Sequence, residues 1–252
     1  MQLDALPDPT RELFEYAAAC EELSPFTLVG GTALALQAGH RLSLDLDFAV
    51  FTESLPEGAI DRWINRVRKD GIGADNITDL EAASRFRINT GLPLAKFAQD
   101  YEISGVRVTF FTLGKNPAQR EFYSSTDALH SNHRCFAIMG MDGLKVAKTL
   151  VLADRIRSRD LYDLMILMRD HGLTIQRQTE IVQTLGHNND IEHYLSAMTG
   201  DLPLDREDEG LKATGAAISV DEIYRFLTGK IDEWQIDQAR LFVQNQDVEP
   251  YS

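Results

Sequence analysis

An α/β fold, with an N-terminal mixed sheet followed by a C-terminal helical domain, is predicted by three features of the 252-residue sequence. An apolar run, Phe26 to Val29, meets a glycine pair and then a helix-compatible segment, which is the pattern of a strand, a tight turn and a helix. Strand-like patterns recur as far as Phe136 to Met139, and apolar residues beyond them repeat at helical spacing. We therefore expect an α/β domain at residues 1–140 and a helical domain at residues 141–252.

The composition limits the class of protein. With 44% hydrophobic residues, the chain can build one large domain or two small ones. A formal net charge of −14 argues against a general nucleic-acid coat protein, because phosphate neutralisation needs clustered Lys and Arg, although a local basic site is still allowed. No apolar run approaches the roughly 20 residues of a membrane helix, and residues 1–16 lack the layout of a signal peptide. We expect a cytoplasmic protein without membrane contact.

The glycine pair, Gly30 and Gly31, is the first candidate binding feature. The helix-compatible segment Thr32 to Ala38 follows it, and its first residue has a hydroxyl suited to an N-terminal cap. Such a junction aims backbone N–H groups and the positive end of a helix dipole at one spot, which suits a phosphate. Glycines at this turn would allow the phosphate to approach the backbone closely.

A pair of acids, Asp45 and Asp47, follows in the strand-like run Leu44 to Phe51. Period-two geometry places both carboxylates on one face of the strand and the alternating apolar residues on the other. Adjacent carboxylates repel each other unless a cation lies between them, and magnesium prefers oxygen ligands while keeping substrate phosphates in its shell. Alone, however, such a pair is more often a pair of strand-end acids that face water.

The order of these features is more specific than either feature alone. A glycine pair, a helix and S-x-D-x-D resemble the signature of minimal polymerase-beta-like nucleotidyltransferases, and GGTALAL…GHRLSLDLDF is similar to the AbiEii/AbiGii family of nucleotidyltransferase toxins. The resemblance implies that the β and γ phosphates of a nucleoside triphosphate are held by Gly30, Gly31 and Thr32. It also implies that Asp45 and Asp47 bind Mg²⁺.

A second constellation, K-x-L-x-L-x-D-R-x-R-x-R-D-x-Y-D-L, lies in the helical half. It resembles two further motifs of the same family, a lysine seven residues before an arginine and an R-D-x-x-D-L helix. Those places are held here by Lys148, Arg155, Arg159, Asp160, Asp163 and Leu164.

The chemistry of this second constellation leaves alternatives open. Lys148 can neutralise charge on a pyrophosphate leaving group, and we assign Arg155 to nucleotide binding together with Ser43. Asp160 and Asp163 share a helix face, and either could accept a proton from the attacking hydroxyl or orient the lysine. Alternatively, both acids form a structural ion network with Lys148 and the nearby arginines.

The expected later strands lack one acid of the wider superfamily. We expect strands within Ile77 to Phe111, where Arg85, Arg87 and Asn89 alternate with Phe86, Ile88 and Thr90, and again at Gly105 to Thr112. In the superfamily a third carboxylate often follows V-x-V, but this sequence has Thr109 there. Two-metal chemistry of the full polymerase type is therefore in question, and the toxin family resembles this chain in using only the D-x-D pair.

Helices are expected from apolar periodicity, and Ser158 is suited to cap one of them. The expected helices are residues 9–23, Glu57 to Lys69, Met141 to Ala153, Arg159 to Asp170, Thr174 to Leu185, Ile191 to Met198, Val220 to Leu227 and Ile231 to Phe242. An acidic, turn-rich segment, Gly200 to Gly210, separates two of them.

The expected activity is transfer of a nucleoside monophosphate from a nucleoside triphosphate to an acceptor. The resemblance implies a toxin with a cognate antitoxin, and in some relatives the acceptor is the 3′ end of a transfer RNA. Two alternatives are modification of a protein or small molecule, and a degenerate member that binds a nucleotide or partner without turnover.

Overall fold

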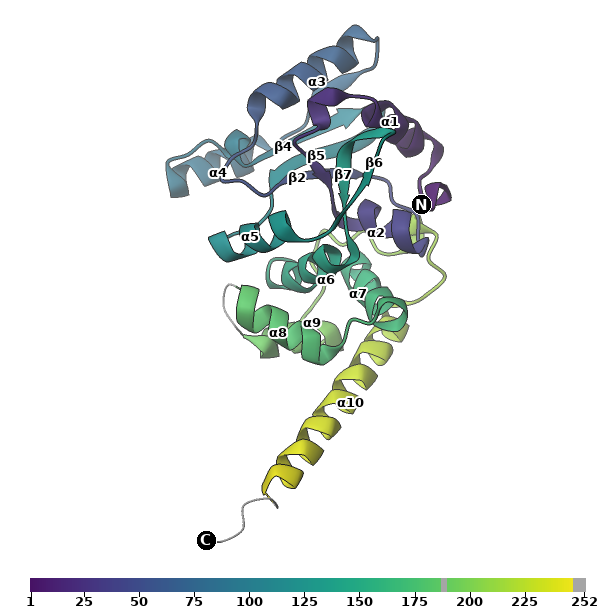
Figure 1. Cartoon of the computed structure of the whole chain (residues 1–252), viewed down its shortest axis with the longest axis vertical. Helices are drawn as coiled ribbons and strands as arrows, with labels where there is room; N and C mark the ends of the chain where they lie inside the picture. The colour runs from purple at the N-terminus through teal and green to yellow at the C-terminus, as the bar shows by residue number, and fades with distance from the viewer. Residues whose placement is uncertain (187–189, 247–252) are drawn as a thin grey trace. The chain divides into compact units, whose positions relative to one another are not determined.

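The computed structural model describes residues 1–186 and 190–246, and this part of the chain forms two compact units. Unit 1 contains Met1–Leu144 and the short segment Thr214–Ala216, whereas unit 2 contains Lys145–Ala213 and the chain from Ala217 onward. The division falls within one helix, α6 (Met141–Leu150). Figure 1 shows the elements of each unit along the colour gradient.

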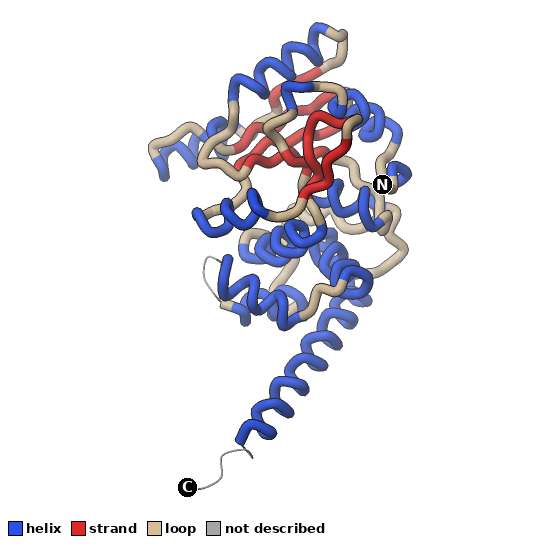
Figure 2. Tube along the Cα trace, in the orientation of Figure 1, coloured by secondary structure: helices blue, strands red, loops and turns tan. Residues whose placement is uncertain are grey.

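Unit 1 is built around one mixed sheet. In the described residues seven strands follow the order β3-β4-β5-β2-β1-β7-β6, drawn red in Figure 2. The strands are β1 (Thr27–Leu28), β2 (Leu46–Val50), β3 (Ala74–Asn76), β4 (Ala98–Ile103), β5 (Val106–Thr112), β6 (Ala128–Ser131) and β7 (Arg134–Met139). The helices of this unit are α1 (Asp8–Ala18), α2 (Gly30–Ala38), α3 (Glu57–Lys69), α4 (Leu80–Thr90) and α5 (Pro117–Ser125).

The core of unit 1 lies on one face of this sheet. Phe48 of β2 stacks on Phe110 of β5 with ring centroids 5.6 Å apart, and Trp63 of α3 packs edge-on against both rings. Phe14 of α1 meets Phe136 of β7 in the same way. Because side chains alternate along a strand, the intervening residues of β2 and β5 are directed to the opposite face of the sheet.

The glycine turn is tied directly to the strand that carries the acid pair. β1 pairs antiparallel with β2, with Leu28 opposite Phe48, and the Val29 N–H donates to the Asp47 carbonyl at 2.8 Å. β2 in turn pairs parallel with β5. The start of α2 and the first residues of β2 are therefore held side by side by backbone hydrogen bonds.

Unit 2 is helical in its described part. It contains the rest of α6, then α7 (Ser158–His171), α8 (Ile175–Leu185), α9 (Ile191–Thr199) and α10 (Val220–Gln246). α7 is the central helix, because the side chains from Asp160 to Met168 are all buried. α10 packs against α7, α8 and α9, and its last turns extend beyond those helices (Figure 1).

The structure corrects four local expectations. The alternating segment at 85–90 is not a strand but lies in α4. The expected helices Val220 to Leu227 and Ile231 to Phe242 are one continuous helix, α10. Neither expected hydroxyl cap is used, since the N-cap positions of α2 and α7 are Val29 and Arg157.

Candidate functional site

The glycine turn of unit 1 requires glycine at its first position. Gly30 opens α2 with φ +70°, in the left-handed region that favours glycine. A Cβ added there would lie 2.6 Å from Oδ2 of Asp47. The Asp47 carboxylate therefore lies directly over the first turn of α2, in space that any other residue at position 30 would fill.

The backbone at this turn is suited to an anion. The first N–H groups of an α-helix have no acceptor within the helix, and they carry the positive end of its dipole. In α2 these positions belong to Gly30, Gly31 and Thr32. The three residues that the sequence predicts for phosphate binding thus form the first turn of one helix.

The two predicted hydroxyl residues connect the turn to the acid pair. Thr32 Oγ1 lies 2.7 Å from Ser43 Oγ and also donates to the carbonyl oxygen of Asp45. Both hydroxyl residues are buried. Their side chains therefore fix the segment that leads into β2.

The two predicted acids lie at the start of β2. Asp47 is the second residue of β2 and Asp45 immediately precedes the strand, and both are half-buried. Leu46 and Phe48 between and beyond them are fully buried in the core. The Asp47 carboxylate is consequently on the side of β2 opposite the aromatic core.

Arg41 is a site residue that the sequence reasoning missed. Its side chain is only 8% exposed, its guanidinium closely approaches the position where a Cβ of Gly31 would be, and it donates to the Leu42 carbonyl at 3.1 Å. A buried cation is thus packed on the glycine turn. The sequence signal that could have identified Arg41 is its place between the glycine pair and the acid pair.

The donor set fits a hard divalent cation that completes its shell with substrate and water oxygens. Asp45 and Asp47 supply carboxylate oxygens, and the absent Cβ at Gly30 leaves room beside Asp47. Among the described residues there is no group of three or more His, Cys, Asp or Glu side chains that could enclose a metal ion. Two carboxylates would supply part of the roughly six to eight oxygen ligands that such cations take.

The predicted residues of unit 2 form a buried ion cluster. Lys148 Nζ lies 2.7 Å from Asp160 Oδ1 and 2.6 Å from Asp163 Oδ2. Lys148 is 5% exposed and Asp163 is 0% exposed. Arg155 Nε contacts the second oxygen of Asp160 at 3.0 Å, and 44% of the Arg155 side chain is exposed. Two cations and two anions therefore balance each other in this cluster.

The charges of the cluster keep Asp160 ionised. Burial by itself would raise the pKa of Asp160, but the nearby Lys148 and Arg155 charges and the hydrogen bond from Lys148 outweigh burial and lower that pKa. Asp160 is accordingly a poor proton acceptor in this arrangement. Both acids hold the ammonium group of Lys148 in one place.

The other two arginines of this region are engaged by the acidic segment. Arg157 contacts Glu207 at 3.3 Å, and Arg159 contacts Glu209 at 3.2 Å. Asp208 Oδ1 accepts from both the backbone N–H and the hydroxyl of Ser158. The Gly200 to Gly210 segment thus neutralises the basic residues at the start of α7.

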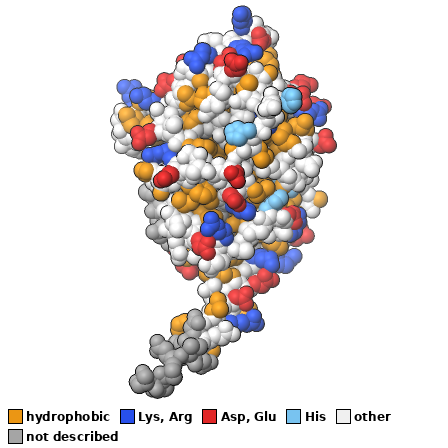
Figure 3. Space-filling view, in the orientation of Figure 1, with side chains coloured by type: hydrophobic (Ala, Val, Ile, Leu, Met, Phe, Trp, Pro, Cys, Tyr) orange, Lys and Arg blue, Asp and Glu red, His pale blue; other side chains and the backbone are white. Residues whose placement is uncertain are grey.

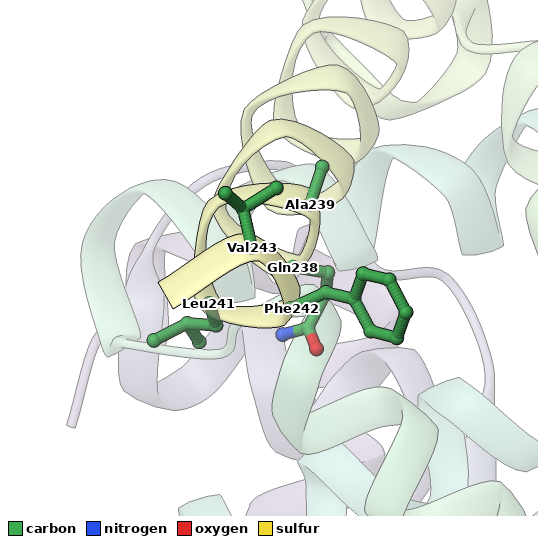
Figure 4. Close-up of a pocket in the computed structure, with 5 residues that line it drawn as sticks. All are labelled: Gln238, Ala239, Leu241, Phe242 and Val243. Atoms are coloured by element: carbon green, nitrogen blue, oxygen red, sulfur yellow. The ribbon is translucent and has the colours of Figure 1, made fainter. Parts of the chain in front are cut away.

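A depression at the end of α10 lies apart from these residues within unit 2. It is lined by Gln238, Ala239, Leu241, Phe242 and Val243, all of which project from one helix (Figure 4). No motif residue contributes to it. On the face drawn in Figure 3, acidic and basic side chains are interspersed. None of the described helices combines the length and apolar character of a membrane span.

Comparisons with known proteins give several similar chains. The chain is 28% identical over 185 residues to an uncharacterized protein of Aquifex aeolicus (strain VF5). The aligned region covers 71% of this chain and 75% of the relative. A crystal structure of a proposed nucleotidyltransferase from H. pylori aligns with a TM-score of 0.48 at 17% identity, covering 90% of this chain and 94% of that one. The nucleotidyltransferase toxin MenT4 of Mycobacterium tuberculosis aligns with a TM-score of 0.43 at 13% identity, covering 86% and 83%.

A family model decides the assignment. The model described as "Nucleotidyl transferase AbiEii toxin, Type IV TA system" matches residues 11–244, which include every motif residue considered above. The match makes this chain a nucleotidyltransferase by family and places it among the toxins of toxin–antitoxin systems, with a nucleotide substrate and an antitoxin implied. The chain belongs to the AbiEii nucleotidyltransferase toxin family.

Proposed function

We propose that this protein transfers a nucleoside monophosphate from a nucleoside triphosphate to an acceptor and releases pyrophosphate, with Mg²⁺ as the cofactor. The observation that supports this most is the position of the Asp47 carboxylate over Gly30 at the start of α2. A phosphate-binding helix start and a cation-binding carboxylate are adjacent there, as nucleotidyl transfer requires.

In unit 1 the first turn of α2 binds the β and γ phosphates through the backbone N–H groups of Gly30, Gly31 and Thr32. Asp45 and Asp47 hold Mg²⁺, which supplies neutralisation of the triphosphate charge when it is bound. Ser43 contributes by fixing Thr32 and the segment before β2. Arg41 adds a positive charge beside Gly31.

In unit 2 Lys148 counters the charge that develops on the pyrophosphate, and Arg155 contacts the nucleotide through its exposed part. Asp160 and Asp163 orient Lys148, since both contact its ammonium group and both are buried. We infer that this cluster and the acid pair of unit 1 serve the same reaction. Weaker Mg²⁺-dependent nucleotide binding together with loss of transfer in a folded Arg155→Ala variant would support the role of Arg155.

The favoured acceptor is RNA, with the 3′ end of a transfer RNA as the first candidate, and the protein acts in the cytoplasm as the toxin of an antitoxin-controlled pair. The family match supports the toxin role. The net charge of −14 requires that RNA be bound through a local surface.

The test is a transfer assay with each α-labelled nucleoside triphosphate, Mg²⁺ and total cellular RNA. We expect label in a ribonuclease-sensitive product. We expect Asp47→Asn to lower the rate at least about 100-fold, because a charged ligand is lost from the reacting centre. Asp75→Asn is the matched control, since Asp75 is an exposed acid on β3 of the same sheet, and its rate should be unchanged.

Two other outcomes would redirect the assignment. Label in a ribonuclease-resistant product would identify a protein or small molecule as the acceptor. Magnesium-dependent nucleotide binding without transfer to any acceptor would identify a binding protein without turnover, the alternative that Thr109 favours.

A further inference from the structure

The strand register aligns three polar residues across the sheet of unit 1. Asp47 of β2 is the register partner of Thr109 of β5, and Thr109 is the register partner of Asp100 of β4. All three are half-buried, while the residues before and after each of them on its strand are buried. The row therefore lies on the face opposite the aromatic core.

Asp100 is firmly placed in this row. Its N–H donates to Thr78 Oγ1 at 3.0 Å, and its carbonyl oxygen accepts from Ile77 N–H at 2.9 Å. Its carboxylate lies 3.3 Å from the guanidinium of Arg107. Both the backbone and the side chain of Asp100 are thus held by neighbours outside the row.

Asp100 also fixes the direction of the Thr109 hydroxyl. Thr109 Oγ1 donates to Asp100 Oδ1 at 2.8 Å. A hydroxyl has one hydrogen and two acceptor lone pairs, and an ionised carboxylate can only accept. The hydrogen of Thr109 is therefore committed to Asp100, and the hydroxyl oxygen can act toward its other neighbours only as an acceptor.

Distance separates the roles of the two residues. Adjacent strands are about 4.8 Å apart, so Thr109 is one spacing from Asp47 while Asp100 is about 9.6 Å away. The Asp100 carboxylate is engaged by Thr109 and Arg107. Thr109 is close enough for its oxygen to accept a hydrogen bond from water around such a cation.

We propose that the Thr109–Asp100 pair replaces the third carboxylate of the wider superfamily: Thr109 binds the hydration water of the cation held by Asp47, and Asp100 is a positioning residue that acts through Thr109. This inference rests on the proposed function of the acid pair. The carboxylate is on β4, at Asp100, instead of at the Thr109 position on β5. It acts on the site through the hydrogen bond that Thr109 donates to it, which is strengthened because the acceptor is charged.

The test measures cation affinity rather than turnover. Mn²⁺ binding is followed by electron paramagnetic resonance in the presence of a nucleoside triphosphate analogue that cannot be transferred. We expect Asp100→Asn and Thr109→Val each to weaken Mn²⁺ binding about tenfold, as loss of partners that orient a metal's ligands typically does. The double variant should lose no more than either single variant, because the two residues act as one unit.

Three further variants separate positioning from a structural role. Thr109→Ser keeps the hydroxyl and should retain wild-type affinity. The double change of Asp100→Asn with Thr109→Asp moves the carboxylate back by one strand at constant charge and should restore Mn²⁺ binding. Glu102→Gln is the control, because Glu102 is an exposed acid two residues along β4, and it should bind Mn²⁺ as the wild type does. Thermal unfolding verifies the fold of each variant.

The results that would overturn the inference are distinct from failure of the proposed function. Wild-type Mn²⁺ affinity in folded Asp100→Asn and Thr109→Val, beside a wild type that binds Mn²⁺ with nucleotide, would disprove the role of the pair alone. A wild type that binds neither Mn²⁺ nor nucleotide would disprove both the role of the pair and the proposed function.

Discussion

At the scale of single residues, Gly30 allows both the left-handed backbone of the turn and the close approach of the Asp47 carboxylate. Its φ of +70° and the 2.6 Å separation between Asp47 and the position of an added Cβ both exclude a larger residue. In Gly30→Ala the added methyl group must displace the Asp47 carboxylate. We expect transfer activity to fall about 100-fold, because small displacements at a reacting centre are costly.

Gly91 provides the matched control for backbone strain. It also has a positive φ, +74°, at the end of α4, but no atom lies within 4 Å of its added Cβ. Gly91→Ala should lower the free energy of unfolding by about 1 kcal/mol through strain alone and leave transfer unchanged. Equal activity loss in the two alanine variants would show that Gly30 acts only through the backbone.

Residue identities at the site could be read from the sequence only in part. The glycines and acids were recognised because they are contiguous along the chain and their order is specific. The contacts of Thr32 with Ser43 and Asp45 could not be foreseen, since they depend on how the loop before β2 folds back on α2. The packing of Arg41 on Gly31 depends on the same loop.

At the scale of secondary-structure elements, the Lys148 cluster should make the stability of unit 2 depend on pH. The pKa of Asp160 is lowered in the folded protein, so its ionisation stabilises the fold above the ordinary carboxylate range, and this contribution is lost as pH falls through the lowered pKa. Asp160→Asn should cost about 3 kcal/mol near pH 7. The difference from wild type should shrink below the ordinary pKa of 3.8.

Urea unfolding of the wild type and of Asp160→Asn, near neutral pH and in acid, measures the difference in their free energies of unfolding. Asp170→Asn is the control on the same helix, because Asp170 lies in an exposed ion pair with Arg169, and such pairs contribute about 0.5 kcal/mol. An Asp160→Asn variant as stable as wild type at neutral pH would contradict the proposal that Asp160 holds Lys148 in place.

The start of α7 gives a second prediction at this scale. Asp208, fifty residues along the chain, accepts from the N–H and hydroxyl of Ser158 and thereby supplies the cap that Arg157 does not. Asp208→Ala should lower unfolding free energy by about 1 kcal/mol, the typical value of a helix cap. Asp205→Ala removes only a 3.8 Å contact to Arg157, so its free energy of unfolding, measured by chemical denaturation, should differ little from that of the wild type. An equal decrease in Asp205→Ala and Asp208→Ala would contradict the capping role of Asp208.

The α4 error has a physical explanation. The helix has no buried residue, so apolar periodicity, the main sequence signal, carries no information about it. The local signals were at its ends: Asp79 caps the N-terminus by accepting from Glu81 N–H at 2.8 Å, and Gly91 ends it in the left-handed conformation. By contrast, α3 has the predicted bounds because its buried face repeats at helical spacing.

The continuity of α10 follows from its packing. Ile223, Leu227 and Ile231 are four residues apart and all are buried, so the helix continues past Gly229. A glycine in a helix costs only about 1 kcal/mol relative to alanine. Beyond Gln238 the apolar side chains (Figure 4) are exposed. Apolar residues in a helix usually indicate a buried face, so the sequence could not show that this end of α10 is exposed.

At the scale of the whole molecule, the fold class was predictable because the change from strand patterns to helical patterns is long and consistent. The order of the strands was not, since β4 and β5 lie between β3 and β2 in the sheet and such non-local pairing leaves no local signal. The same register aligns Asp47 with Thr109 and Asp100, which lie on a hairpin much later in the sequence. Function therefore depends on contacts that only the folded chain reveals.

The central claim, nucleotidyl transfer, is tested most directly by comparing α-labelled and γ-labelled nucleoside triphosphate in one assay with Mg²⁺ and RNA. The account predicts that the α label enters the acceptor and the γ label leaves as pyrophosphate, in equal amounts. Transfer of the γ label to the acceptor, or transfer of neither label by a folded protein that binds the nucleotide, would contradict it.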